Sequence, residues 1–435
     1  MTLLINQLDE HNESGIIYLI KNKVEEVLFL YDTEQEDLMK SIKEYYSSSF
    51  SNIKLYEERI TEGNIDEFKE ILEKYKRDDM IINLTGGKRI NSLILLNLCK
   101  ENKIKCFYTD IRKKLMYSFN EQLLKTKEEI EDLNLLSIIK GFGGNIVEDS
   151  YELCLKDDLI YFSKQIYNNL DLWNKHKQRL YDNSIFLHEE NNPEIIHIDY
   201  SRIEDEERKL LDLILNKMKE MNEIVFSKNN DKVKVRFLNN YIKGFIFKSG
   251  TWLEIATNNL LKNIKEIDEC RNGVIFLWNN GRKTVRNELD VIAVKDSVPI
   301  CISCKDSDKY NEMALNELNV YANKIGGKNA YKILVATKEP IKEPVKMRAK
   351  EMGIHLVIFD GNEEKFINKI RKIIINDELS KWWMMNYEWW IKEETRRVSR
   401  KIIFLNSSSL FQNSSFLIHN FFSDFFSHLY CWFKA

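Results

Sequence analysis

Two carboxylates and a lysine in the second half of the chain have the types and order that metal-dependent cleavage of a phosphodiester requires. Glu254 lies in "GTWLE", Asp290 in "RNELDVIAV" and Lys305 in "PICISCKDS". Carboxylates hold Mg²⁺ or Mn²⁺, and a lysine stabilises the attacking hydroxide or the pentavalent phosphate. Glu317, on a following helical segment, is a further acid within reach of the same cleft. The order helix acid, strand acid, strand lysine, helix acid favours a nuclease.

Each of these residues also has a simpler interpretation. Asp290 and Lys305 can form an ordinary ion pair between two strands, and Glu254 can be a solvated helix residue. For any one residue this interpretation is the better one. Only the whole set, in its order along the chain, points to catalysis.

The stretch "PICISCK" contains Cys301 and Cys304, a spacing that also occurs in zinc and redox motifs. In a strand, residues three apart point to opposite faces, so the two sulfurs do not converge. No second Cys or His pair stands at zinc-binding spacing. We therefore expect both cysteines to be core thiols. The same parity places Ser303 and Lys305 on one face.

The stretch "IINLTGGKR" has the form of a strand, a glycine turn and a helix start. Two glycines allow a positive φ and close approach of a ligand, and free N–H groups at a helix start attract a phosphate. The candidate residues of this turn are Thr85, Gly86, Gly87, Lys88 and Arg89. The turn is neither a Walker A motif nor G-x-G-x-x-G. A plain strand-to-helix connection is the alternative interpretation.

Residues 2–119 alternate apolar strand-like runs with helical segments of 10–15 residues, a pattern typical of a Rossmann-like parallel sheet covered on both faces. Ligands of such sheets bind beyond the carboxyl ends of the strands. Further candidates for the ligand site follow other strands at that edge: Gln7, Asn12, Thr33 and Asp110.

The remaining chain divides into three further segments. Residues 141–235 carry mostly helical periodicity and predict a mainly helical connector. Residues 236–378 combine strands and helices in a second α/β domain, whereas 1–140 form the first. Residues 379–435 are rich in aromatic residues and serine, and no chemistry is assigned to them. This tail is too interrupted to predict a membrane-spanning helix.

Composition restricts the kind of protein. The chain has 435 residues, of which 43% are hydrophobic and 31% charged, and a formal net charge of −3, so any polyanion site must be a local patch. Seven cysteines without framework spacing are typical of a reducing compartment. The N-terminal stretch lacks the features of a signal peptide. Together these features predict a cytoplasmic protein with no membrane association.

The motifs "NLTGG", "GTWLE", "NELDVIAV", "ISCK" and "YANKIGGKNAY" resemble the CRISPR-associated ancillary nucleases that join an N-terminal CARF domain to a PD-(D/E)xK restriction-endonuclease-like domain. The resemblance covers roughly residues 1–375. It implies a homodimer that binds a cyclic oligoadenylate, above all cyclic tetra-adenylate, at the CARF turn. It also implies ligand-activated, metal-dependent cleavage of single-stranded RNA, single-stranded DNA or supercoiled DNA.

Two positions depart from the family pattern. Lys88 and Arg89 stand where the turn often reads Thr-Lys, which keeps its basic character. Ser303 stands where an acid is expected two residues before Lys305, so Glu254, Asp290 and the Cys304 carbonyl would hold the metal, with Glu288 or Glu317 as a further candidate ligand. Fewer carboxylates favour Mn²⁺ over Mg²⁺. The alternative function is a nucleotide-sensing regulator that binds nucleic acid without cutting, and a third is an interaction module without catalysis.

Overall fold

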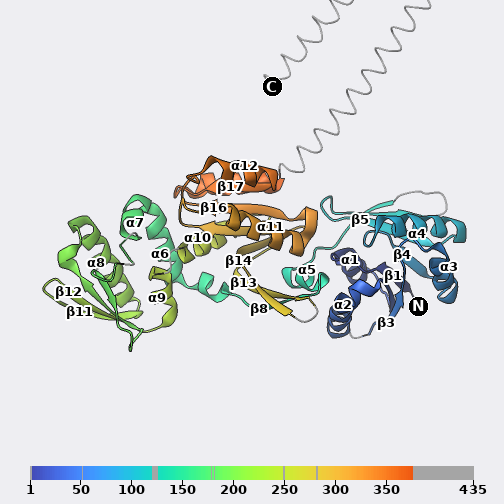
Figure 1. The fold of residues 1–435 in the computed structure, drawn as a ribbon, viewed down its shortest axis with the longest axis horizontal. Helices are drawn as coiled ribbons and strands as arrows, with labels where there is room; N and C mark the ends of the chain where they lie inside the picture. The colour runs from blue at the N-terminus through green and yellow to red at the C-terminus, as the bar shows by residue number, and fades with distance from the viewer. Residues whose placement is uncertain are drawn as a thin grey trace, which may run out of the picture. The chain divides into compact units, whose positions relative to one another are not determined.

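The computed structural model describes residues 2–50, 52–119, 126–177, 179–180, 182–247, 250–280 and 283–375. They form three regions, each built around its own sheet (Figure 1). The aromatic tail expected at 379–435 lies outside the described residues. Within the described part of the chain, no helix is both long and apolar enough to cross a membrane.

The first α/β region, residues 2–141, has a seven-stranded sheet in the order β3-β2-β1-β4-β5-β6-β7. The strands are β1 (Leu3–Gln7), β2 (Glu26–Tyr31), β3 (Lys54–Arg59), β4 (Met80–Asn83), β5 (Lys105–Asp110), β6 (Leu115–Phe119) and β7 (Thr126–Glu129). The helices are α1 (Glu13–Lys21), α2 (Glu36–Ser49), α3 (Ile65–Lys74), α4 (Arg89–Asn102) and α5 (Leu135–Gly141). The first five strands pair in parallel, as the buried apolar runs predict, and β6 and β7 pair antiparallel.

The second α/β region has a six-stranded sheet in the order β17-β16-β15-β14-β13-β8. Its strands are β8 (Gly144–Glu148), β13 (Glu269–Asn280), β14 (Lys283–Lys295), β15 (Val298–Lys305), β16 (Tyr331–Ala336) and β17 (Ile354–Ile358). Its helices are α10 (Thr251–Leu261), α11 (Glu312–Gly326) and α12 (Glu343–Glu351). The strands β13, β14 and β15 form an antiparallel meander, and β15, β16 and β17 pair in parallel.

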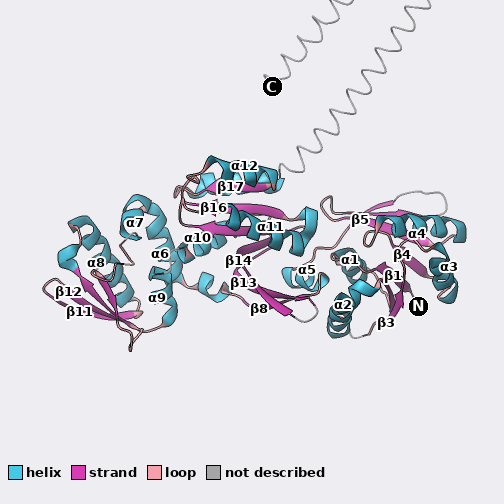
Figure 2. Cartoon of the chain, viewed as in Figure 1, coloured by secondary structure: helices cyan, strands magenta, loops and turns pink. Residues whose placement is uncertain are grey.

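The segment expected to be a mainly helical connector contains a sheet of its own (Figure 2). Its antiparallel strands are β9 (Phe186–His188), β10 (Ile195–Asp199), β11 (Ile224–Asn229) and β12 (Lys232–Phe237). They lie among α6 (Asp157–Asn168), α7 (Leu170–Lys177), α8 (Asp205–Glu220) and α9 (Asn240–Phe247). The strands β9 and β10 are short, so the helical periodicity of the longer flanking segments masked them. The strand β8, from the same segment, joins the second region's sheet.

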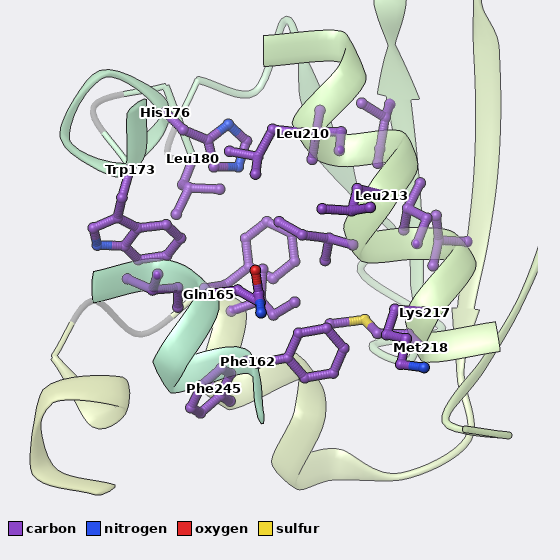
Figure 3. A pocket seen from close by; sticks show the side chains of 18 of the residues that line it. Phe162, Gln165, Trp173, His176, Leu180, Leu210, Leu213, Lys217, Met218 and Phe245 are labelled. Carbon is purple, nitrogen blue, oxygen red and sulfur yellow. The ribbon is translucent and has the colours of Figure 1, made fainter. Parts of the chain in front are cut away.

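The core of this small antiparallel region encloses a cavity of about 60 Å³ (Figure 3). Aliphatic and aromatic side chains form most of its wall, including Phe162 of α6 and Leu213 of α8. At one side lies His176, whose Nδ1 is 2.9 Å from the Glu207 carboxylate, and both side chains are buried. We interpret the cavity as a packing gap in an apolar core rather than as a catalytic site.

The buried carboxylate of Asp306 joins the small antiparallel region to the second α/β region. Its Oδ2 accepts hydrogen bonds from the indole N–H groups of Trp173 on α7 and Trp252 on α10, each at 2.8 Å. Its Oδ1 accepts from Lys177 at 2.7 Å and from Thr337 at 3.0 Å. Burial opposes ionisation of Asp306, but these hydrogen bonds hold its pKa below the usual value. The end of β15 is therefore fixed to α7, α10 and the end of β16.

Replacing Asp306 with alanine is expected to lower the free energy of unfolding by about 3 kcal/mol, because two buried indoles lose their acceptor and Lys177 loses its counter-ion. Urea unfolding at pH 7 measures this loss. Since the folded-state pKa of Asp306 is depressed, its stabilisation is complete above the unfolded pKa and is lost as the pH falls through the folded value. The control is Asp308→Ala, a nearby half-buried acid. If Asp306→Ala and Asp308→Ala lower the free energy of unfolding by the same small amount, the buried Asp306 carboxylate does not stabilise the fold.

Candidate nuclease site and ligand cavity

The Asp290 carboxylate on β14 is held by three donors from β15. Its Oδ2 accepts from the Ser303 hydroxyl at 3.0 Å, from the Cys304 backbone N–H at 2.6 Å and from Lys305 Nζ at 3.4 Å. The antiparallel register explains this, because Val291 pairs with Ile302 and so brings Asp290 opposite Ser303. The structure therefore brings Asp290, Ser303 and Lys305 together, as strand parity predicts.

Lys305 is a fixed cation. Burial lowers its pKa, but the charge of Asp290, with a further contribution from Glu317, raises it above the usual value. The ammonium group is therefore protonated at neutral pH and does not act as a base. Its role in chemistry at a phosphate would be to neutralise negative charge.

Glu254 lies in the first turn of α10 and is half-buried. Burial raises the pKa of the Cys304 thiol, and the charges of Asp290 and Glu254 raise it further. Both carboxylates therefore act electrostatically on one position of β15. The Cys304 sulfur itself lies 3.7 Å from the Thr257 hydroxyl, in the core between β15 and α10. The thiol is thus a core group, and ligation through the Cys304 carbonyl stays a prediction.

The residues of this site suit a hard divalent cation. Asp290 and Glu254 supply carboxylate oxygens and Ser303 a hydroxyl, which are the donors that Mg²⁺ and Mn²⁺ prefer. Among the described residues, three acids gather closely enough to chelate one ion only at Asp132, Asp268 and Asp296. There, Lys114 Nζ lies 2.7 Å from Asp132 and 3.1 Å from Asp296, so an internal cation already offsets part of the cluster's negative charge.

The set Glu254, Asp290 and Glu317 does not form such a tight cluster. Glu317 is exposed on α11, and its carboxylate accepts a hydrogen bond from the Tyr321 hydroxyl at 2.9 Å. Glu317 acts on Lys305 through its charge. A cation at this site would therefore be bound chiefly by Asp290 and Glu254, with water completing the shell.

A cavity of about 580 Å³ opens at the carboxyl ends of the parallel strands of the first region. Of the residues predicted for a ligand, Gln7, Gly87 and Lys88 line it. Gln7 is 4% exposed, and its amide oxygen has no hydrogen-bond partner within the described residues. The amide nitrogen donates to Ser92 at 3.0 Å, and the oxygen lies beside Gly87. An unpartnered buried acceptor is expected to meet a donor on a ligand.

The turn at 85–89 has the geometry that its glycines predict. Gly87 has a φ of +79°, and a Cβ there would lie 2.5 Å from the Gln7 amide oxygen. Its N–H does not point into empty space, because it donates to Asp9 Oδ2 at 3.0 Å. Burial raises the pKa of Asp9, against the opposing effect of the bond from Gly87. An internal carboxylate thus occupies the position at which the sequence predicts a phosphate.

The other predicted ligand residues serve the framework or the surface around the cavity. The Thr85 hydroxyl accepts from the backbone N–H of Thr109 at 2.8 Å. Asn12 is buried and donates to the Gly141 carbonyl at 2.8 Å. Gly86 approaches the backbone of Gln7. Three further predicted residues do not line the cavity. Thr33 begins a 3₁₀ turn, and Arg89 is the exposed first residue of α4. Asp110 forms an ion pair with Lys113.

Sequence reasoning missed several lining residues. Asp9, Glu10 and His11 directly follow β1 and belong to the cavity wall, together with Trp278 of β13 and Lys324 of α11. The first three could have been found, because "LDEH" follows the first strand at the predicted edge. Trp278 and Lys324 could not, since only the folded chain brings them to the first region.

Comparison with known proteins identifies the second α/β region. Residues 243–380 match the family described as Card1-like, endonuclease domain. The solved structure of VC1899 from Vibrio cholerae is 18% identical, with a TM-score of 0.66 over 86% of this chain and 98% of that one. Can2 from Sulfobacillus thermosulfidooxidans, solved with cyclic tetra-adenylate, is 17% identical, with a TM-score of 0.64 over 86% and 99%. No curated protein matches the sequence significantly.

These findings confirm two predictions. The chain resembles the CRISPR-associated nucleases with a CARF domain, and its fold class is α/β with a parallel-sheet N-terminal region. Residues 243–380 carry an endonuclease-type domain, which contains the whole Glu254, Asp290, Lys305 constellation. The two solved structures establish the shared fold.

Replacing Ser303 with aspartate is expected to tighten Mn²⁺ and Mg²⁺ binding by roughly tenfold, because a second carboxylate beside Asp290 adds a hard ligand. Without metal, the two like charges raise each other's pKa and destabilise the site. Calorimetric titration of the intact protein measures the affinity. Ser303→Ala is the control, since it removes the hydroxyl and adds no ligand. If both variants bind the cations equally, Ser303 does not face the metal position.

Proposed function

We propose that this protein is a metal-dependent endonuclease of type III CRISPR antiviral defence, activated by a cyclic oligoadenylate. The observation that carries the proposal is the joining of Asp290 and Lys305 in a region that matches an endonuclease domain. The large cavity at the edge of a Rossmann-like sheet in the same chain supports a nucleotide sensor. The proposed substrate is single-stranded RNA or DNA, cut with little sequence preference.

The roles at the proposed catalytic site follow from the contacts. Asp290 and Glu254 hold Mn²⁺ or Mg²⁺, which when bound supplies an activated water and charge neutralisation. Lys305 supplies the positive charge that stabilises the negative charge developing on the phosphate. The Ser303 hydroxyl and the Cys304 N–H fix the orientation of Asp290. Glu317 contributes negative charge near Lys305.

The proposed activator is cyclic tetra-adenylate, the ligand of the structurally similar Can2. A ring with several phosphodiesters suits a homodimer, in which two copies of the 85–89 turn meet it on the two-fold axis. Lys88 and Lys324 supply positive charge in each cavity. The cavity wall also contains several acids, among them Asp9, Glu10 and Asp32. We assign Glu10 and Asp32 to the amino groups of the adenines, which are hydrogen-bond donors, whereas Asp9 is held by the Gly87 N–H.

The alternative function is a regulator that senses the nucleotide and binds nucleic acid without cutting it. The observation in its favour is that Asp290 Oδ2 is already satisfied by three protein donors, with serine at the position of the expected acid. The two functions differ in one measurable property, which is cleavage.

Purified protein with Mn²⁺ is expected to cut labelled RNA or DNA only when cyclic tetra-adenylate is present. Lys305→Ala should reduce this cleavage by about a hundredfold, because the developing charge on the phosphate loses its cation. The matched control is Lys309→Ala, an exposed lysine four residues further on, which should leave cleavage unchanged.

Undiminished cutting by Lys305→Ala would indicate a contaminating nuclease and overturn the catalytic assignment. Activator binding without cleavage by the wild-type protein, in either metal, would favour the regulator. Chelation of the metal should abolish cleavage while leaving the affinity for cyclic tetra-adenylate intact.

Asp9→Ala is expected to tighten cyclic tetra-adenylate binding by roughly tenfold, because it frees the Gly87 N–H and removes a negative charge next to it. Calorimetry measures the affinity. Glu34→Gln is the matched control, since it removes a charge from the same cavity without freeing that N–H. If both variants bind cyclic tetra-adenylate equally more tightly, the loss of negative charge alone explains the effect, and the Gly87 N–H has no specific role. Lys88→Ala, which removes a cation that lines the cavity, should act in the opposite direction and weaken binding.

A further inference from the structure

The helix α11 contributes to both candidate sites. Glu317, in its second turn, acts on Lys305 through its charge. Lys324, in its last turn, lines the ligand cavity, and its Nζ lies 3.9 Å from the Glu10 carboxylate. Directly after the helix, the backbone at Gly327 approaches His11 so closely that a Cβ would lie 2.7 Å from its Nε2. One rigid element thus spans the distance between the two sites.

A row of aromatic rings leads from the cavity wall to the same helix. Trp278 and Phe142 both line the cavity. The Tyr321 ring on α11 lies 6.2 Å from the Trp278 ring and 5.9 Å from the Phe276 ring, and the last two lie 5.6 Å apart. Such close-packed rings cannot shift independently, since the core around them is dense. A ligand that moves Trp278 therefore acts on Tyr321.

The row ends in a polar contact at the candidate nuclease site. The Tyr321 hydroxyl donates to Glu317 Oε1 at 2.9 Å. Burial, this hydrogen bond and the charges of Glu317 and Glu288 raise the pKa of Tyr321 to about 12. The hydroxyl therefore stays protonated at neutral pH and remains a donor. Because the bond reaches an exposed carboxylate, we expect its effect to be modest.

We propose that Tyr321 is a positioning residue, which ties the Glu317 carboxylate to the wall of the ligand cavity and so couples activator binding to nuclease activity. The inference rests on the proposed function. It differs from ordinary core packing, because packing requires the ring alone and the coupling requires the hydroxyl. The competing explanation is that Glu317 and Tyr321, four residues apart on α11, only stabilise the helix.

The test is Tyr321→Phe, which keeps the ring contacts and removes the donor. The measured quantity is the activation ratio, cleavage with cyclic tetra-adenylate divided by cleavage without it, beside the calorimetric affinity for the activator. The expected result is an activation ratio lowered about fivefold, with an unchanged affinity. The matched control is Tyr310→Phe, which removes another tyrosine donor of the same region, to the Lys338 carbonyl at 3.2 Å. This control should keep the wild-type ratio.

A second arm separates positioning from a structural role. In a Glu317→Ala background, which removes the acceptor, Tyr321→Phe should cause a smaller further change in the activation ratio than in wild type, because both variants act through one contact. Thermal unfolding of both tyrosine variants shows whether either is destabilised.

The outcomes are distinct. A wild-type protein that cyclic tetra-adenylate does not activate overturns the proposed function itself. An activated wild type with an unchanged ratio in Tyr321→Phe overturns only the role of Tyr321. A loss of cleavage that is equal with and without activator also overturns it, since the hydroxyl would then serve stability or catalysis rather than coupling.

Discussion

A single buried carboxylate, that of Asp306, determines where the elements of the candidate nuclease site meet. A charge that is 6% exposed is tolerated only when its lone pairs are satisfied, and here the donors come from α7, from α10 and from the end of β16. If any of these elements moved away, Asp306 would lose a hydrogen bond, and displacement of α7 would also remove Lys177, the cation that pairs with its charge. Lys305 is the neighbour of Asp306 in sequence, and Glu254 follows Trp252 on α10. The geometry of the site thus depends on the small antiparallel region as much as on its own sheet.

The ligand cavity has a comparable constraint in the loop after β1. Asn12 holds this loop through its bonds to the backbone of Asp9 and Gly141. Asp9 reaches the Gly87 amide on one side, while Glu10 and His11 approach α11 on the other. The loop is therefore in contact with both the turn that would bind a phosphate and the helix that carries Glu317. A change at either place is transmitted through few bonds, which is the physical requirement for coupling two sites.

The sequence allowed the fold class and the nuclease constellation to be predicted because both depend on local regularities. Buried apolar runs report parallel strands, and strand parity places Ser303 beside Lys305 before any coordinates are known. The four-stranded sheet of the connector was missed because β9 and β10 are too short for a clear alternation. The importance of Asp306 and Trp278 was not predictable, since it comes from contacts with residues far away in sequence.

Ser303 changes the electrostatic state of the site rather than simply removing a ligand. A carboxylate at this position would repel Asp290 and would need a cation to be stable, whereas the serine hydroxyl donates to Asp290. Together with Cys304 N–H and Lys305, it satisfies Oδ2 of Asp290. Metal binding must then compete with internal donors for the same carboxylate. A site of this kind should bind divalent cations weakly in the absence of the activator. A conformational change that reorients Glu254, Glu317 or Lys305 would then change the fraction of sites that hold a metal ion by a large factor. In the proposed ligand-controlled nuclease, the serine would make metal occupancy depend on the activator.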